Sequence, residues 1–307
     1  MPVHASGQNH VLDHHRLAAV TPSSLKSAVV PFRNRHLAPS VALWSPVKLL
    51  FSETTPDYAH YLYPYVVWAF LEPGEVAADA FEAGFLPGNP EMERFHLVRN
   101  LRVPLREWKP SSENRRILRK GEGVRMELIA KGDFPDTPER RERWLTYAEE
   151  RFGPGIMHRE RLNRLLAGPV ISHFLYFTDA EGRELGTVLM YLEAPRVAYY
   201  YYAFFELSDP TRNLGMLMMT RAAEALVREG FEHLYLGTCV TPKARYKLQF
   251  EPIEFFNGFR WSRQRKELRH LLETDLPGRH RLDTPEFLAL QPGPPAELAR
   301  VSRFRVG

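Results

Sequence analysis

The chain has 307 residues, of which 44% are hydrophobic and 25% are charged, and it carries a net charge of +4. No apolar run approaches the roughly 20 residues that span a bilayer, so we expect no transmembrane helix and no membrane partner. The single cysteine, Cys239, excludes an internal disulfide framework and a cysteine-rich metal site, and it fits a reducing, cytoplasmic setting. We therefore expect neither a metal nor a cofactor, while the mildly basic charge permits an RNA or phosphate partner. The sequence leaves the oligomeric state open.

The N-terminal part of the chain changes in composition near residue 45. Residues 1–45 are rich in His, Pro, Ser and Val without a sustained period, which is typical of a loosely ordered extension. Residues 46–125 are expected to form an N-terminal subdomain that leads into the core. Its aromatic segment, 58–70, is typical of core packing, with a platform for stacking a nucleotide base as the alternative. A helix over 75–84 and a strand over 96–105 follow it.

A dense basic cluster follows this strand, with four cations in the six residues 115–120. Ser112 is the expected N-cap of the short helix that carries them. A solvated helix face and a contact to a phosphate backbone explain this density equally well. Arg115 and Arg119 are the candidate substrate contacts within it.

Residues 126–273 are expected to form the main domain, of the α+β class. The periodicity and the turn residues predict two helices, three strands joined by tight turns, a polar loop, a helix, a strand and a last basic helix. These elements are the helices 138–151 and 158–166, the strands 169–177, 186–192 and 197–205, the helix 214–229, the strand 233–238 and the helix 261–273. The tail over 274–307 is rich in Pro and Arg and is expected to be loosely ordered.

The junction before the helix at residue 214 is suited to an anion. Arg212 and Gly215 flank the free amides of a helix N-terminus, whose dipole favours a negative charge. Gly215 would let a ligand approach the backbone closely. An ordinary capped turn explains this motif equally well when it is taken alone.

The order of these elements resembles the core of the GNAT acyltransferases, in which an antiparallel meander precedes a phosphate loop, a helix and a strand. In that family the loop carries a (Gln/Arg)-x-x-Gly-x-(Gly/Ala) pattern that holds a pyrophosphate. Arg212 and Gly215 match this pattern, and Leu217 stands at its final small position. The resemblance implies a GNAT-like catalytic core with an N-terminal subdomain.

Three further segments, in the same order over roughly residues 84–261, resemble the aminoacyl-tRNA–protein transferases, which comprise the arginyl-transferases and their bacterial leucyl-transferase relatives. They are LRVPLREWKPSSENRRILRK (101–120), Phe204-Phe205 with Arg-Asn-Leu-Gly at 212–215, and LYLGTCVTPKARYKLQFEP (234–252). The resemblance implies an enzyme that moves arginine or leucine from charged tRNA to the N-terminal amine of a protein or peptide, usually one with an acidic first residue.

The same resemblance implies roles for individual side chains. Arg212 and Gly215 would hold a phosphate of the tRNA acceptor end, and Arg245 and Lys247 would meet a tRNA phosphate or the acidic carboxylate. Tyr246 would stack on the terminal adenine or donate a hydrogen bond. The catalytic candidates are Glu206, as the proton acceptor, Tyr246 and Lys247, and the substrate-binding candidates are Arg212, Gly215, Tyr202, Arg245, Gln249, Arg115 and Arg119.

Two other functions fit the same residues. An N-acyltransferase that uses acyl-coenzyme A would need the anion loop and no tRNA contact. A catalytically inactive GNAT-fold binding module is favoured by Thr238, Ala244 and Leu248, which stand where the transferases usually have Tyr, Met and Gly.

Overall fold

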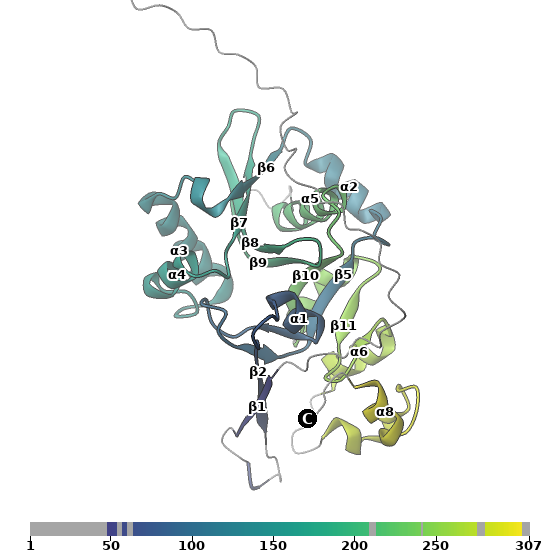
Figure 1. The fold of residues 1–307 in the computed structure, drawn as a ribbon. Coiled ribbons are helices and arrows are strands. Elements are labelled where there is room, and N and C mark those ends of the chain that lie inside the picture. The colour runs from purple at the N-terminus through teal and green to yellow at the C-terminus, as the bar shows by residue number, and fades with distance from the viewer. Residues whose placement is uncertain are drawn as a thin grey trace, which may run out of the picture. The chain divides into compact units, whose positions relative to one another are not determined.

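The computed structural model describes residues 48–53, 57–59, 64–208, 213–240, 242–274 and 280–302. The extension predicted over residues 1–45 lies outside these ranges. An eight-stranded sheet, in the order β12-β11-β5-β10-β9-β8-β7-β6, carries most of the packing, and a four-stranded sheet adjoins it (Figure 1). No helix in the described ranges is both long enough and apolar enough to cross a membrane.

One half of the large sheet is an antiparallel meander. It contains β6 (Arg125–Ala130), β7 (His173–Thr178), β8 (Glu184–Glu193) and β9 (Val197–Phe205). Helix α5 (Leu214–Arg228) then leads to β10 (His233–Thr238), which pairs with β9 in parallel. This order confirms the predicted α+β, GNAT-like core. Strand β6 was not predicted, because most of its side chains are exposed and it lacks a buried apolar face.

Strand β9 contains a bulge at its centre. Leu189 of β8 pairs with Tyr202 while the next residue, Met190, pairs with Tyr200. Tyr201 is therefore an extra residue without a partner in β8, and such a residue bends its strand and increases the local twist. The pairing between β9 and β10 also stops early, since it joins only residues 197–199 to residues 233–235. Beyond this point the two strands part.

The predicted strand over 96–105 is two strands, which corrects that expectation. Strand β4 (Phe95–Leu97) belongs to the small sheet, whereas β5 (Asn100–Pro104) pairs with β10 in the large one. An alternating pattern does not reveal a change of hydrogen-bonding partner between two neighbouring segments. The small sheet also contains β1 (Lys48–Glu53), β2 (Tyr65–Phe70) and β3 (Phe85–Pro87), and α1 (Ala77–Glu82) packs with it.

Helices cover both faces of the large sheet (Figure 1). On one face, α3 (Pro138–Phe152) and α4 (Arg159–Ala167) bury an aromatic core against β7 and β9. On the other, α2 (Ser112–Lys120) and α5 pack side by side. Ser111, rather than the predicted Ser112, caps α2, because its hydroxyl accepts a hydrogen bond from the Asn114 amide at 3.1 Å.

The C-terminal part is more ordered than its composition indicated. Trp261 and Ser262 form strand β12 beside β11 (Glu254–Phe256), so the predicted helix starts only at α6 (Arg265–Glu273). Where it is described, over residues 280–302, the predicted loose tail contains three short helices, and Phe287 and Leu298 are buried. The remaining elements are η1 (Lys131–Asp133), η3 (Pro242–Gln249), η4 (Arg281–Asp283), α7 (Pro285–Leu288) and α8 (Pro295–Val301).

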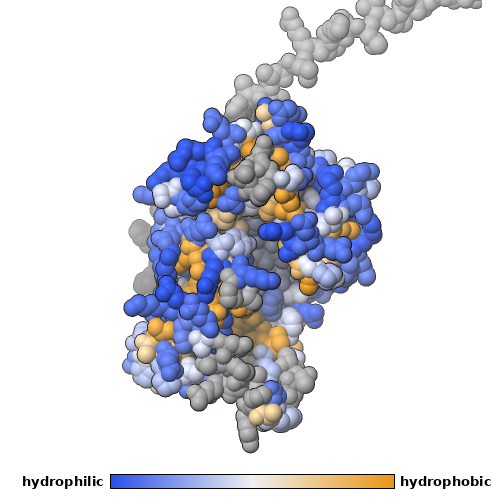
Figure 2. Space-filling view, turned by 180° about the vertical axis from the view of Figure 1, so that it is seen from behind, coloured by the Kyte–Doolittle hydropathy of each residue, from blue (hydrophilic) through white to orange (hydrophobic). Residues whose placement is uncertain are grey.

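The surface opposite to that of Figure 1 is mostly hydrophilic, and hydrophobic side chains show between the polar ones in separate patches (Figure 2). The exposed large hydrophobic residues belong to several elements rather than to one face; among them are Leu50, Leu128, Val227 and Tyr246. Scattered residues of this kind are normal on a globular protein. Hydropathy alone therefore does not mark a functional surface.

Candidate functional site

The parting of β9 and β10 leaves one edge of β10 without a strand partner. The strand is irregular here, because its pairing with β5 shifts register between Tyr235 and Gly237 and Gly237 has a positive φ. The amine of Lys247, from η3, donates hydrogen bonds to two carbonyl oxygens of β10, at 2.7 Å to Leu236 and 3.0 Å to Thr238. A side-chain amine therefore replaces the strand that would otherwise satisfy these groups.

Burial lowers the pKa of Lys247 to about 8, from its ordinary value of 10.5. Among the described residues no carboxylate forms an ion pair with this amine, and the neighbouring Cys239 thiol offsets the effect of burial on its pKa only in part. A partly buried lysine whose pKa lies more than two units below the ordinary value is an unusual group in a protein, and such groups concentrate at sites of chemistry.

Tyr199 and Gly237 lie next to the Lys247 amine. Gly237 has a φ of +75°, a conformation that favours glycine, and a Cβ atom built there would lie 3.8 Å from the Tyr199 hydroxyl and 4.0 Å from the Lys247 Nζ. The Tyr199 side chain is buried, and this burial raises its pKa well above the usual value. The phenol therefore stays protonated and remains able to donate a hydrogen bond.

A second group of tyrosines flanks the same place. Tyr246 is 46% exposed, while the partial burial of its hydroxyl raises its pKa. The phenols of Tyr147 and Tyr200 lie close enough to Tyr246 to influence each other's ionisation, and Arg151 favours the ionised form of Tyr246. The buried Tyr200 hydroxyl has no hydrogen-bond partner among the described residues. Buried hydroxyl groups are nearly always hydrogen-bonded, so this one is an exception within the described residues.

The predicted anion loop is described only in part. Arg212 lies outside the described residues. Asn213 precedes α5 in the left-handed conformation, and its side chain makes no capping hydrogen bond. A Cβ atom on Gly215 would lie 3.0 Å from the Phe205 ring, so this position favours glycine for packing as well as for close approach of a ligand. The Phe205 ring also contacts Tyr147, and Tyr147 lies near Tyr246. The N-terminus of α5 and Tyr246 therefore lie near the same pair of aromatic side chains.

Glu206 follows the end of β9 and is exposed. The amide of Ser208 donates a hydrogen bond of 2.9 Å to its carboxylate, and this bond lowers the pKa of Glu206. A carboxylate stabilised in this way is a weaker base than Lys247, whose unprotonated form is favoured by burial.

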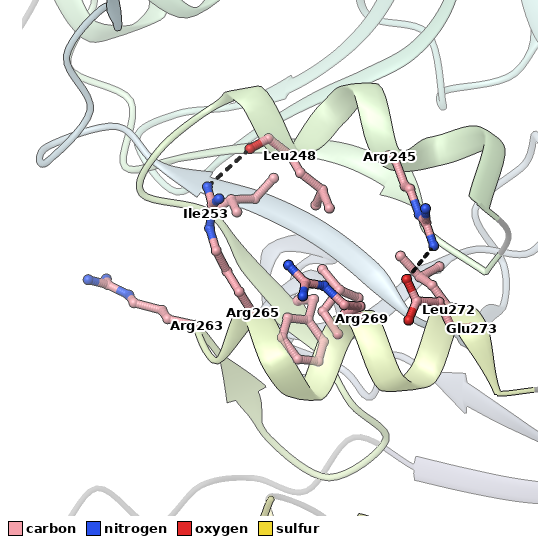
Figure 3. A pocket seen from close by; sticks show the side chains of 10 residues that line it. Arg245, Leu248, Ile253, Arg263, Arg265, Arg269, Leu272 and Glu273 are labelled. Atoms are coloured by element: carbon pink, nitrogen blue, oxygen red, sulfur yellow. Dashed lines mark hydrogen bonds and ion pairs between the residues drawn. The ribbon is translucent and has the colours of Figure 1, made fainter.

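Arg245 lies on a different side of η3 from Lys247. In a 3₁₀-helix, residues three apart share a face, so Arg245 shares a face with Leu248 and Tyr246 shares one with Gln249. Arg245 and Lys247 are two residues apart and therefore lie on different faces. Arg245 forms an ion pair of 2.9 Å with Glu273 and lines a cavity of about 230 Å³ between η3 and α6 (Figure 3). The structure therefore does not bring Arg245 and Lys247 together at the parting of β9 and β10.

The other predicted contacts are spread over the surface. Arg115 and Arg119 are both exposed on α2, as a phosphate contact requires, and Arg115 donates to the Pro110 carbonyl at 2.6 Å. The Tyr202 hydroxyl accepts a hydrogen bond of 3.3 Å from Arg161. Gln249 is exposed. Among the described residues no group of three His, Cys, Asp or Glu side chains is placed to hold a metal ion.

Sequence reasoning missed two members of this site. Tyr199 belongs to a run of aromatic residues that predicts a strand, and nothing in that run distinguishes Tyr199 from its neighbours. Tyr147 lies 52 residues before Tyr199 in the chain, and no local pattern connects α3 to this place. Cys239, in contrast, is buried as expected of a small hydrophobic residue, and burial raises the pKa of its thiol.

Comparison with known proteins shows which proteins this chain resembles. Residues 144–257, from α3 to just beyond β11, match the family described as the C terminus of arginine-tRNA-protein transferase, and Lys247 lies within the match. The chain is 27% identical over 230 residues to an aspartate/glutamate leucyltransferase of Pseudomonas fluorescens (strain SBW25), which covers 70% of this chain and 96% of that protein. The protein of the same name from Pseudomonas entomophila (strain L48) is 25% identical over 233 residues, with the same coverage.

Two solved structures are among those similar to this chain. L-PGS from Bacillus licheniformis has a TM-score of 0.34 and 13% identity, over 53% of this chain and 51% of that chain. FemX has a TM-score of 0.35 and 10% identity, over 46% of this chain and 53% of that chain.

Proposed function

We propose that this chain, as a member of the aminoacyl-tRNA–protein transferase family, transfers an amino acid from charged tRNA to the α-amine of an acidic N-terminal residue. The observation that carries the proposal is the Lys247 amine, which lies within the family match, occupies the open edge of β10 and has a pKa near 8. The donor is arginine or leucine, and leucine is favoured because the curated relatives are leucyltransferases.

The reaction needs no covalent nucleophile on the protein, because the aminoacyl ester is already activated. The acceptor nitrogen attacks the ester carbonyl carbon, a C–N bond forms, and the C–O bond to the terminal ribose breaks. Holding the amine and the ester in one geometry supplies roughly 7–11 kcal/mol in well-oriented cases. The protein must also take up the proton that the attacking ammonium loses.

Lys247 is our candidate for this proton acceptor, in place of Glu206. In its neutral form the amine has two N–H groups, which the carbonyls of Leu236 and Thr238 bind, and a lone pair that remains available. Its pKa of about 8 also matches that of a protein α-amine, about 7.7–8.0, so that transfer of the proton between them is nearly balanced. Tyr199, a protonated phenol that like Lys247 lies near Gly237, is our candidate donor to the developing oxyanion.

We infer that the tRNA contacts the exposed cations of α2 and the N-terminal end of α5. Arg115 and Arg119 supply charge without a fixed carboxylate partner among the described residues, and Gly215 opens the helix whose positive end favours phosphate. We also infer a cytoplasmic location, since the chain has one buried cysteine and needs no oxidising compartment.

The test is mass spectrometry of a peptide with an N-terminal Asp after incubation with the protein and either leucyl-tRNA or arginyl-tRNA. We expect the mass of one amino acid to be added, and the added mass identifies the donor. Omission of the tRNA is the control. Absence of any product with both charged tRNAs, together with protection against thermal melting by coenzyme A, would contradict the proposal and favour an acyl-coenzyme A enzyme.

A further inference from the structure

The cavity between η3 and α6 takes no part in the reaction proposed above. It has a volume of about 230 Å³ (Figure 3). An engineered cavity of about 150 Å³ lined by apolar side chains binds benzene, so this one has room for a flat ring. The apolar side chains that line it, of which the first is partly buried and the others are buried, are Leu248, Ile253, Phe255, Leu268 and Leu272.

Two contacts join η3 to α6 at this cavity. Arg245 of η3 forms an ion pair of 2.9 Å with Glu273 of α6, and Arg265 of α6 donates to the Leu248 carbonyl at 3.4 Å (Figure 3). Arg265 also forms an ion pair with Glu251. The charges of both arginines are therefore compensated by carboxylates, and the two contacts hold the opposing walls of the cavity together.

Arg269 is the lining arginine that no carboxylate compensates within the described ranges. Arg263, the fourth arginine of the lining, pairs with Glu107 and Glu254, at 2.7 and 2.8 Å. The Arg269 guanidinium forms no ion pair or hydrogen bond with the described part of the chain, and Figure 3 shows it between the two contacts that join η3 to α6. Because its side chain is also exposed, an anion can reach it directly from solvent.

An apolar lining beside one uncompensated cation fits a ligand that joins a flat ring to an anion. Guanidinium groups bind phosphate oxygens through paired, charge-assisted hydrogen bonds, and they stack on the planes of bases. The Glu273 carboxylate and the Leu248 carbonyl retain lone pairs that can accept hydrogen bonds from the amino group of a base. An alkyl acid would use the cation and the apolar lining but neither acceptor, whereas a nucleotide uses all three.

We propose that the cavity between η3 and α6 binds a nucleotide, with the base against the apolar lining and the phosphate on Arg269. A free nucleotide and an unpaired RNA strand present the same base and phosphate, so both sources fit. The site goes beyond the proposed function, because a nucleotide binds there whether or not an amino acid is transferred. Where that function holds, the unpaired 3′ end of the tRNA is the strand at hand, because η3 carries both Arg245, in the lining, and Lys247.

The test measures the binding of AMP by isothermal titration at low salt, with adenosine and inorganic phosphate as its two halves. We expect AMP to bind at least about tenfold more tightly than either half, because only AMP contacts the apolar lining and the guanidinium together. Octanoate, an acid with an alkyl body, should bind more weakly than AMP, because it bonds to neither acceptor.

Arg269→Gln is the variant that tests the site, and Lys266→Gln is its matched control. Both residues are exposed on α6 and both changes remove one positive charge, but only Arg269 lines the cavity. Arg269→Gln should weaken AMP binding about tenfold, and Lys266→Gln should weaken it by less than about twofold. Thermal melting checks that both variants are folded.

A comparison of tRNA with and without its unpaired 3′ nucleotides distinguishes the two sources, and this arm alone rests on the proposed function. If the strand is the ligand, the truncation weakens binding to the wild type more than to Arg269→Gln, and AMP competes with the intact tRNA. If a free nucleotide is the ligand, AMP binds as expected and the truncation changes neither affinity. Either result supports the site.

Equal effects of the two substitutions on AMP binding would overturn the inference, since they would show only a general attraction to a basic surface. Adenosine, phosphate or octanoate that binds as tightly as AMP would overturn it as well. The two proposals fail separately. AMP binding without amino-acid transfer would refute only the proposed function, and transfer by a protein that does not bind AMP would refute only this inference.

Discussion

Replacing Lys247 tests the reaction most directly, since its amine is the only group we assign to proton uptake. With a pKa of about 8, roughly a fifth of the molecules carry a neutral Lys247 at pH 7.4, against roughly one in a thousand at the ordinary value of 10.5. The structure therefore raises the fraction of usable base by about two hundredfold. Lys247→Met removes this base while it retains the length of the side chain.

We expect both Lys247→Met and Lys247→Arg to lower the transfer rate to an Asp peptide by about 100-fold or more, the typical share of general-base catalysis. Arginine retains the positive charge but does not lose its proton near neutral pH. The rate is measured as kcat/KM with saturating charged tRNA, and circular dichroism controls for folding. An arginine variant within threefold of the wild type would show that charge alone is required, and it would refute proton uptake by Lys247.

The same pKa predicts how stability depends on pH. Between about pH 8 and 10.5, Lys247 is protonated in the unfolded chain and largely neutral in the folded one, so the unfolded state binds more protons and stability rises with pH. Below pH 8 the folded protein carries the full cost of the buried ammonium, about 3 kcal/mol. Urea unfolding at pH 7.5 and 10 should show this gain in the wild type and not in Lys247→Met. Equal gains in both proteins would contradict the assignment.

Three further expectations concern other parts of the molecule. Arg115→Ala with Arg119→Ala should weaken tRNA binding and reduce the slope of log affinity against log salt by about two; an unchanged slope in a filter-binding titration would exclude α2 from the interface. Gly121→Ala should cost about 1–3 kcal/mol, because its Cβ would lie 2.3 Å from a methyl group of the buried Leu217; thermal melting measures this, with Gly132→Ala as a control that meets no atom within 4 Å. Glu267→Leu should lower the free energy of unfolding in urea by about 3–5 kcal/mol. The fully buried carboxylate accepts hydrogen bonds from Asn257, Ser262 and Gln291, at 2.6, 2.7 and 3.0 Å. A decrease below about 1 kcal/mol would show that these donors find other partners.

The core of the fold was predictable because its elements carry strong local signals. The strand over 233–238 and the strand over 197–205 have the predicted bounds, since each is a continuous apolar or aromatic run between turn residues. Predictions failed where the tertiary environment decides the structure. Strand β6 is formed by pairing with β7 although most of its residues are exposed, and the chain changes sheets between β4 and β5 without a turn signal.

The site was less predictable than the fold. The family resemblance led to Lys247, but its proton affinity depends on two carbonyl groups at the open edge of β10 and on burial that no local pattern encodes. Tyr147 and Tyr200 are 53 positions apart in the sequence, and only the folded chain brings both of them near Tyr246.

The short connection between β4 and β5 has a mechanical consequence. Only Val98 and Arg99 separate the two strands, and Arg99 is tied at both ends: its carbonyl accepts from the Cys239 amide at 2.8 Å, and its guanidinium donates to the Leu271 carbonyl at 3.0 Å. A connection of two residues leaves β4 and β5 little freedom to move relative to each other. Because β5 pairs with β10, a displacement of β4 reaches the strand whose carbonyl groups bind Lys247.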